Sequence, residues 1–264
     1  MKTQLTIACL CLMIVSLMLT EQSSALIDEQ FIAGIWLLDE GTGKVAMDSS
    51  ENGNNGELIG DPKWVAGKFG KGLEFDGKDD MVDTPYVSEE QQSAFTILAW
   101  IQPSIAISTQ IVVAGRSNGG PQLNLNGSGK AMTGFKMDNG QFAHVPGTTT
   151  FPKGKWTHAA GTYDGSVIKV YVDGVEEGTL KPSNPPGKNA YTVQIGAFDE
   201  RLHGGGYVGQ FAPAAIDEVA VFNIALTAKE LNTIITQGLY RAAMSVSLSG
   251  KLTSTWGNIK ANGR

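Results

Sequence analysis

The sequence predicts an all-β protein, folded as a sandwich of two antiparallel sheets. From Phe31 onward, short runs of β-branched and aromatic residues alternate with clusters of Gly, Pro, Asn and Asp, which is the pattern of short strands joined by turns. The chain contains 33 glycines, in keeping with many tight turns. Helical periodicity is weak until Thr227, so sheets account for most of the body.

The clearest strands are predicted at 34–38, 73–75, 81–84, 95–101, 110–115, 122–125, 156–163, 168–172, 191–196 and 216–222. Two Asp-Gly pairs, Asp164-Gly165 and Asp173-Gly174, separate consecutive runs late in the chain. Asp-Gly favours the two-residue turns that join antiparallel strands. This part of the sequence therefore predicts an antiparallel meander.

One short helix is predicted after the last strand, at 228–237. Thr227 and Glu230 have the T-x-x-E spacing of a capping box, and Gly238 supplies the stop. Such a helix, with one apolar face, is expected to pack against an edge or one end of the sandwich.

The N-terminus has the layout of a secretory signal peptide. Lys2 precedes an apolar run at 5–19, and small residues lead up to Ala25. A retained membrane anchor is the alternative, but the 15-residue run is short of the roughly 20 residues that span a bilayer. The chain is thus predicted to be secreted, without a membrane span after cleavage. Its expected parts are a signal peptide at 1–25, one sandwich domain at 26–240 and a flexible basic tail at 241–264.

Both cysteines, Cys9 and Cys11, fall inside this leader, so the mature protein is expected to contain no disulfide. Cleavage would remove one base, Lys2, and one acid, Glu21, which leaves the net charge at −6. An acidic body of this kind argues against a nucleic-acid partner.

Several blocks together resemble the laminin-G-like jelly-roll family, whose domains share the concanavalin-A-like sandwich. The blocks lie in the family's order at 36–41, 48–56, 67–77, 95–100, 156–165, 171–174 and 216–222. The resemblance implies an extracellular jelly-roll domain. Glu51 departs from the pattern, because the family's loop usually has Gly there.

The 48–56 block also has spacing typical of a calcium loop. Asp48, Ser50 and Asn52 alternate before Gly53, which places oxygen groups at every second position ahead of a tight bend. The closing glutamate of a helical calcium hand is missing, since Ile59 stands at that position. A helical hand is therefore excluded, and another carboxylate must complete any shell.

The resemblance implies that Asp217, in the terminal Ile-Asp-Glu-Val segment, completes it. A structural Ca²⁺ would then be held by Asp48, Asn54, the Gly56 carbonyl and Asp217, with Asn52 as a substitute. The alternative stays open that the run is a plain polar turn, whose side chains cap local backbone amides.

No catalytic constellation stands out, so a non-enzymatic module is predicted. Laminarinase-type glycosidases share the sandwich and use an E-x-D-x-x-E pattern, to which Glu74-Phe75-Asp76 is the nearest approach. The adjacent acids Asp217 and Glu218 are expected on opposite faces of a strand. The histidines, His144, His158 and His203, are scattered, and no serine elbow appears.

Two polar loops are the candidate ligand sites. The segment 198–211 carries Arg201, His203 and Tyr207, and the segment 116–122 carries Arg116 and Asn118. The alternative is that both are ordinary connectors. The predicted function is a secreted binding module for an extracellular glycan, stabilised by calcium. A protein-adhesion or structural module that contacts a surface protein is the second interpretation, and a laminarinase-like hydrolase the third.

Overall fold

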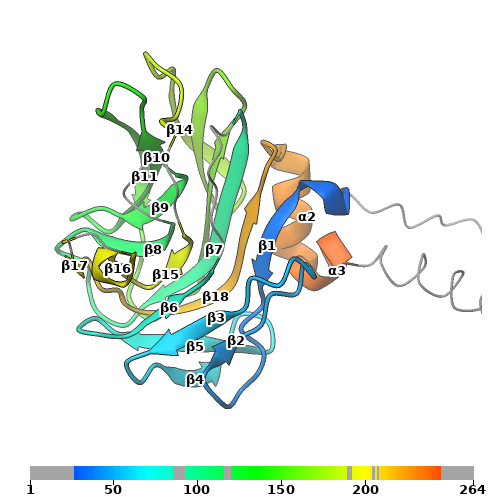
Figure 1. Cartoon of the computed structure of the whole chain (residues 1–264), viewed down its shortest axis with the longest axis vertical. Helices are drawn as coiled ribbons and strands as arrows, with labels where there is room; N and C mark the ends of the chain where they lie inside the picture. Colours follow the sequence, from blue (N-terminus) through cyan, green and yellow to red (C-terminus); the bar gives the residue numbers. More distant parts are fainter. Residues whose placement is uncertain are drawn as a thin grey trace, which may run out of the picture.

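The computed structural model describes residues 27–85, 93–115, 120–188, 192–203, 206 and 208–244. They form two large antiparallel sheets packed face to face, with helices beside one of them (Figure 1). The predicted all-β jelly-roll sandwich is confirmed. The predicted leader and residues 245–264 lie outside the described residues. Helix α3 (Leu239–Met244) continues the packed body past the boundary predicted at 240, with Ala242 and Ala243 buried.

Sheet A is built around β18 (Pro213–Phe222), its longest strand. One edge of β18 pairs with β7, and the other edge pairs first with β5 and then with β1 (Ile32–Trp36). The strand order is β14 (Val175–Leu180), β13 (Ile168–Val172), β12 (Thr157–Tyr163), β7 (Phe95–Pro103), β18, β5 (Lys71–Asp76) and β4 (Lys63–Ala66). The two Asp-Gly turns join β12, β13 and β14, which confirms the predicted meander.

Sheet B also has eight strands. Their order is β11 (Phe142–Thr150), β10 (Lys130–Lys136), β9 (Gln122–Leu125), β8 (Ile111–Gly115), β15 (Gln194–Ile195), β6 (Met81–Asp83), β3 (Gly56–Ile59) and β2 (Val45–Ala46). A separate hairpin, β16 (Phe198–Asp199) with β17 (Val208–Gly209), follows β15 and includes the short helix η2 (Glu200–His203). Another short helix, η1 (Glu29–Phe31), precedes β1.

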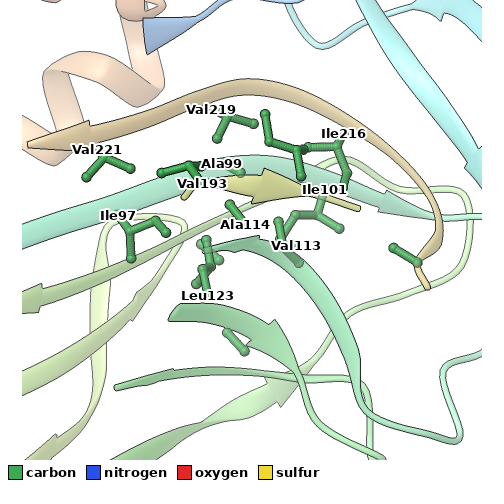
Figure 2. Close-up of a cluster of buried hydrophobic side chains, with 14 of the residues drawn as sticks. Ile97, Ala99, Ile101, Val113, Ala114, Leu123, Val193, Ile216, Val219 and Val221 are labelled. Carbon is green, nitrogen blue, oxygen red and sulfur yellow. The ribbon is translucent and has the colours of Figure 1, made fainter. Parts of the chain in front are cut away.

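The main core lies between the two sheets. Alternate residues of β7 and β18 face residues of β8, β9 and the segment before β15, as Figure 2 shows for Ile97, Ile101, Val113, Leu123 and Val219. All five side chains are buried. Burial of apolar surface on this scale is the main stabilising contribution to a sandwich that has no disulfide among its described residues.

A second core lies on the other face of sheet A. Helix α2 (Ala228–Gln237) buries Leu231 and Ile234 there, in the same cluster as Ile35 and Phe222. Figure 1 shows α2 and α3 beside β1 and β18. The predicted bounds and capping box of α2 are confirmed. The outer face of sheet A is therefore partly covered by helices.

The hairpin formed by β10 and β11 was not among the predicted strands. Gly134 interrupts the first strand, and Pro146-Gly147 interrupts the second, so neither segment shows the expected strand pattern. β11 tolerates Pro146 because it is an edge strand that pairs with β10 alone among the described strands. This unpredicted hairpin carries most of the binding face described next.

Candidate binding face on sheet B

Sheet B has one face in the core and one turned away from sheet A. Core residues alternate along β9, β10 and β11, so the residues between them lie on the outer face. These outer residues are Gln122, Asn124, Lys130, Met132, Lys136, Phe142 and His144. They come from three neighbouring strands. Phe142 is exposed and Lys130, Met132, Lys136 and His144 are half-buried, whereas Gln122 and Asn124 are buried, at 2% and 0% exposure.

An aromatic platform lies near one end of this face. The side chain of Phe142 is large, apolar and 49% exposed. Its ring stacks on the imidazole of His144, with centroids 5.2 Å apart and planes inclined at 27°. Lys136, the cross-strand partner of Phe142, places its Nζ 6.0 Å from the Phe142 ring centroid. The stack holds an exposed aromatic ring in a fixed orientation.

Gly134 makes room for this stack. It is the cross-strand partner of His144, and a β-carbon there would collide with the carbonyl oxygen of Ala143 and approach the His144 ring. A side chain at position 134 would therefore displace the imidazole on which Phe142 rests.

A row of amide side chains continues from the platform across the sheet. Nε2 of His144 lies 3.1 Å from Oε1 of Gln122, and Nδ2 of Asn124 is 3.5 Å from the same oxygen. Burial lowers the pKa of His144, so the imidazole is neutral at pH 7 and donates to Gln122 in its Nε2–H tautomer. Oδ1 of Asn124 is buried without a hydrogen-bond partner among the described residues. These buried amides thus hold the His144 imidazole against which the exposed Phe142 ring packs.

The hairpin of β16 and β17 is anchored to the same sheet. The Gln194 side chain accepts from the backbone N–H of Asp199 at 2.9 Å, and its Nε2 donates to the Asp199 carbonyl at 3.1 Å. Nε2 also donates to Asp83 at 2.8 Å. The Asp199 carboxylate in turn binds Arg201 through two contacts, from Nε at 3.0 Å and from Nη2 at 2.7 Å. Arg201 is thereby fixed by an ion pair.

Of the predicted ligand residues, Arg201 is the one whose side chain the structure describes. His203 ends η2, but its side chain is outside the described set, as are Arg116, Asn118 and Tyr207. Phe142, Lys136 and Gln122 were not among the residues predicted from the sequence. The signal present in the sequence was the alternation of Phe142 with His144, which puts both rings on one strand face.

The predicted calcium loop forms a tightly hydrogen-bonded turn. Oδ1 of Asp48 accepts from the backbone N–H groups of Ile35 and Ser50 and from the Ser50 hydroxyl, at 3.1, 2.9 and 2.6 Å. Oδ2 of Asp48 accepts from the N–H of Asn54 at 3.0 Å. The Asn52 side chain donates to the Ile32 carbonyl at 2.8 Å. These bonds are the ones expected of a polar turn.

The remaining predicted ligands are placed differently. The Asn54 amide donates to the Ala33 carbonyl at 3.1 Å, and Gly56 begins β3. Asp217 lies on β18, whereas the backbone of Asp48 bridges to Trp36 of β1, whose partner on β18 is Val219. Both carboxylate oxygens of Asp48 already accept hydrogen bonds from backbone N–H groups. Calcium binding by this set stays a prediction.

Asp217 and Glu218 occupy a β-bulge where β18 changes partner from β5 to β1. Glu218 has a left-handed backbone with a φ of 52°. Oδ2 of Asp217 accepts from the N–H of Phe69 at 3.0 Å, and Oε2 of Glu218 accepts from the N–H of Leu239. Both partners lie on the helix-covered side of sheet A. The expectation that these acids face opposite sides is therefore wrong, because the bulge breaks the alternation.

Burial raises the pKa of Asp217 to about 8 and that of Glu218 to about 7. The Glu218 charge raises the pKa of Asp217 further, and Oδ1 of Asp217 is buried without a partner among the described residues. This oxygen suits a proton or a hard cation. Both carboxyl groups are too deeply buried to reach a polysaccharide, so this pair cannot serve as glycosidase acids.

A second set of acidic residues lines an open groove at the end of sheet A. Two adjoining cavities of about 380 and 350 Å³ share Asp61 and Lys63. Glu74 and Asp76 line the first of them, and Phe75 between them is buried. A backbone hydrogen bond from Lys78 lowers the pKa of Asp76, which disfavours a role as proton donor.

The family is decided by a sequence profile. The profile of the concanavalin A-like lectin/glucanase superfamily, of the laminin-G type, matches residues 76–232, which is more than half of the chain. The chain belongs to this superfamily. The predicted resemblance is thus confirmed. A comparison with curated proteins found no match.

Among solved structures, this chain is similar to domain 4 of AbnA, a GH43 extracellular arabinanase from Geobacillus stearothermophilus, in complex with arabinotriose. It has a TM-score of 0.61 and 19% identity, and the match covers 78% of this chain and 98% of that domain. The binding domain of Paraclostridial Mosquitocidal Protein 1 has a TM-score of 0.61, with 14% identity, over 78% of this chain and 52% of that one.

The binding domain of Botulinum Neurotoxin DC in complex with SialylT has a TM-score of 0.60, with 15% identity, over 80% of this chain and 52% of that one. The chain thus spans about half the length of these toxin binding domains. At such identities the likeness shows a shared fold. No helix in the described part of the chain is long and apolar enough to cross a membrane.

Proposed function

We propose that this chain is a non-catalytic carbohydrate-binding module that receives a glycan on the outer face of sheet B. The observation that carries the proposal is the exposed Phe142 ring, stacked on His144 and flanked by Lys136, with the imidazole held from below by the buried amides of Gln122 and Asn124. An aromatic surface beside convergent polar groups is the usual composition of a sugar site.

Each part of the face has a physical role in this proposal. The C–H face of a sugar ring packs on Phe142, which removes apolar surface from water at both partners. Hydroxyl groups accept hydrogen bonds from the half-buried Lys136 beside the ring, while the buried amides of Gln122 and Asn124 keep His144 in place. Because His144 and the sheet backbone hold the platform in place before binding, little conformational entropy is lost when the sugar arrives.

The structural neighbours support a binding role over an enzymatic one. One is an arabinanase domain solved with arabinotriose, and others are toxin binding domains, one of them solved with SialylT. These ligands belong to the neighbours. Together with the platform, they favour a glycan as the partner of this chain.

Secretion and calcium belong to the same proposal. The leader at 1–25 supports export, and the unpartnered Asp217 oxygen supports a cation that stabilises the fold. Removal of the cation would lower stability without touching the platform on sheet B.

The test is a glycan array probed with the natural chain, with Phe142→Ala and with Phe142→Trp. Calorimetry then measures the affinity of each protein for every glycan that the natural chain binds. We expect Phe142→Ala to weaken binding by roughly fivefold to thirtyfold, since stacking of an aromatic ring on a ligand contributes about 1–2 kcal/mol. Phe142→Trp should retain binding. Tyr240→Ala is the matched control, because Tyr240 is a similarly exposed aromatic residue on α3, at sheet A.

A protein-adhesion module is the second candidate. The observation in its favour is that the Botulinum neurotoxin DC binding domain has also been solved in complex with rat synaptotagmin II. An array on which the folded, calcium-loaded chain binds no glycan would favour adhesion and overturn the first proposal.

A further inference from the structure

We propose that the glycan received at the Phe142 platform carries an anionic group, which Lys136 binds. This inference rests on the proposed function and specifies its ligand class.

Lys136 is part of the platform. It is the last residue of β10 and the cross-strand partner of Phe142, and its Nζ lies 6.0 Å from the Phe142 ring centroid. That distance is at the outer limit of a cation–π contact, so the ring neutralises little of the ammonium charge. A sugar stacked on Phe142 would place its ring substituents within reach of the flexible lysine side chain.

Lys136 has no carboxylate partner in the part of the chain that the structure describes. The ion pairs found there are Lys63–Asp61, Lys78–Asp76, Lys169–Glu176 and Arg201–Asp199. Asp138, in the adjoining turn, makes no ion pair with Lys136 in this set. The other side chains of that turn are neutral amides, and Asn139 donates to Asn184 at 3.2 Å. A ligand anion would therefore supply the missing countercharge.

Arg201 shows the opposite arrangement. Its guanidinium is held by two contacts with the Asp199 carboxylate, so its charge is already matched. Arg201 thus orders its own loop, while Lys136, beside an exposed aromatic ring, has no ion-pair partner among the described residues. The two cations have different roles, and the specificity for charge belongs to Lys136.

The test uses matched glycan pairs that differ in charge: lactose with sialyl-lactose, galactotriose with trigalacturonate, and xylotriose with its glucuronic-acid-substituted form. Sulfated lactose is added to separate carboxylate from sulfate recognition. Affinities are measured for the natural chain and for Lys136→Gln, Lys136→Arg and Phe142→Ala. Lys130→Gln is the matched control, because Lys130 lies on the same strand and the same face, six residues from Lys136.

We expect the natural chain to prefer the acidic member of at least one pair. Lys136→Gln should weaken that binding about fivefold, as expected for loss of one solvent-accessible ion pair, and leave the neutral member unchanged. Lys136→Arg should retain the preference, added salt should reduce it, and Lys130→Gln should have no effect.

Two different failures are distinguishable. Equal binding of neutral and acidic members, or an unchanged preference in Lys136→Gln, would overturn the charge inference and leave the proposed function standing, provided that Phe142→Ala still weakens binding. If no pair is bound, or if Phe142→Ala binds like the natural chain, the proposed function itself is overturned. Circular dichroism confirms in each case that the variant is folded.

Discussion

At the scale of single residues, the buried acids of β18 make stability depend on pH. In the folded state the pKa of Asp217 rises from 3.8 to about 8 and that of Glu218 from 4.5 to about 7, and burial is the largest cause of both shifts. The folded chain therefore binds more protons at these sites than the unfolded chain, and its stability falls as the pH rises toward these folded values. His158 has the opposite effect on stability, because complete burial lowers its pKa from 6.5 to about 3. Its contribution makes the fold more stable as the pH rises from about 3 to 6.5 and no longer changes above that range.

We therefore expect the free energy of unfolding to fall between pH 6.5 and pH 8 in calcium-free buffer. Urea titrations across this range measure it, and Asp217→Asn should flatten the slope. Asp79→Asn, at an exposed acid, serves as the control. A free energy that stays level or rises with pH in the natural chain would be incompatible with buried, proton-binding carboxyl groups.

Gly134 is the residue on which the platform geometry depends most directly. Gly134→Ala would push a β-carbon against the Ala143 carbonyl and the His144 ring, so we expect lower stability and weaker glycan binding. Gly140→Ala is the control, because Gly140 also has a positive φ, of 82°, but open space around it. Urea unfolding should show a loss about 2 kcal/mol larger for Gly134→Ala than for Gly140→Ala. Equal losses would mean that the crowding at position 134 is relieved without cost.

At the scale of elements, the two edge strands β11 and β14 are joined by one carboxylate. Glu177 accepts from the backbone N–H groups of Thr148 and Thr149, at 2.7 and 2.9 Å, and from the Thr149 hydroxyl. Burial raises its pKa, but these hydrogen bonds outweigh that effect and lower the pKa overall. The carboxylate thus occupies amides that would otherwise be exposed at a sheet edge.

Glu177→Gln should destabilise the chain by about 1 kcal/mol and promote edge-to-edge association. Glu176→Gln on the same strand should do neither, because Glu176 makes a surface ion pair with Lys169. Urea unfolding together with sedimentation velocity measures both effects. If Glu177→Gln remained as monodisperse and stable as Glu176→Gln, the carboxylate would have no protective role.

Elements with strong local signals were predictable from the sequence. The helix α2 was found with its capping box, and the strands β9 and β13 were found with their observed bounds. The hairpin of β10 and β11 was missed, because Gly134 and Pro146 interrupt its pattern while tertiary contacts keep it extended. The bulge at Glu218 was missed as well, since nothing in a glutamate predicts a left-handed backbone.

At the scale of the whole molecule, the fold was predictable and the candidate site was not. The blocks between Trp36 and Phe222 share the family's order, and the profile match confirms what that order implied. The platform depends instead on which strands become neighbours. Phe142 and His144 lie on β11, Lys136 on β10 and Gln122 on β9, and their juxtaposition follows from the pairing register of these three strands.

Calcium is a prediction about the whole fold, because its proposed ligands come from both ends of the domain. If the ion binds, calcium should raise the melting temperature of the natural chain by several degrees, and a chelator should reverse the shift. Asp217→Asn should lose that response while still binding glycan. Differential scanning calorimetry measures the shift in melting temperature. The same melting temperature in calcium and in chelator would show that no calcium ion stabilises the fold.

The proposed function places the glycan on the outer face of sheet B, at the stack of Phe142 on His144. The most direct measurement is an NMR titration of the labelled chain with a glycan that it binds on the array. We expect the largest chemical-shift changes at Lys136, Phe142, His144 and Gln122. Changes confined to sheet A, at the groove lined by Trp64 and Glu74, would contradict the claim.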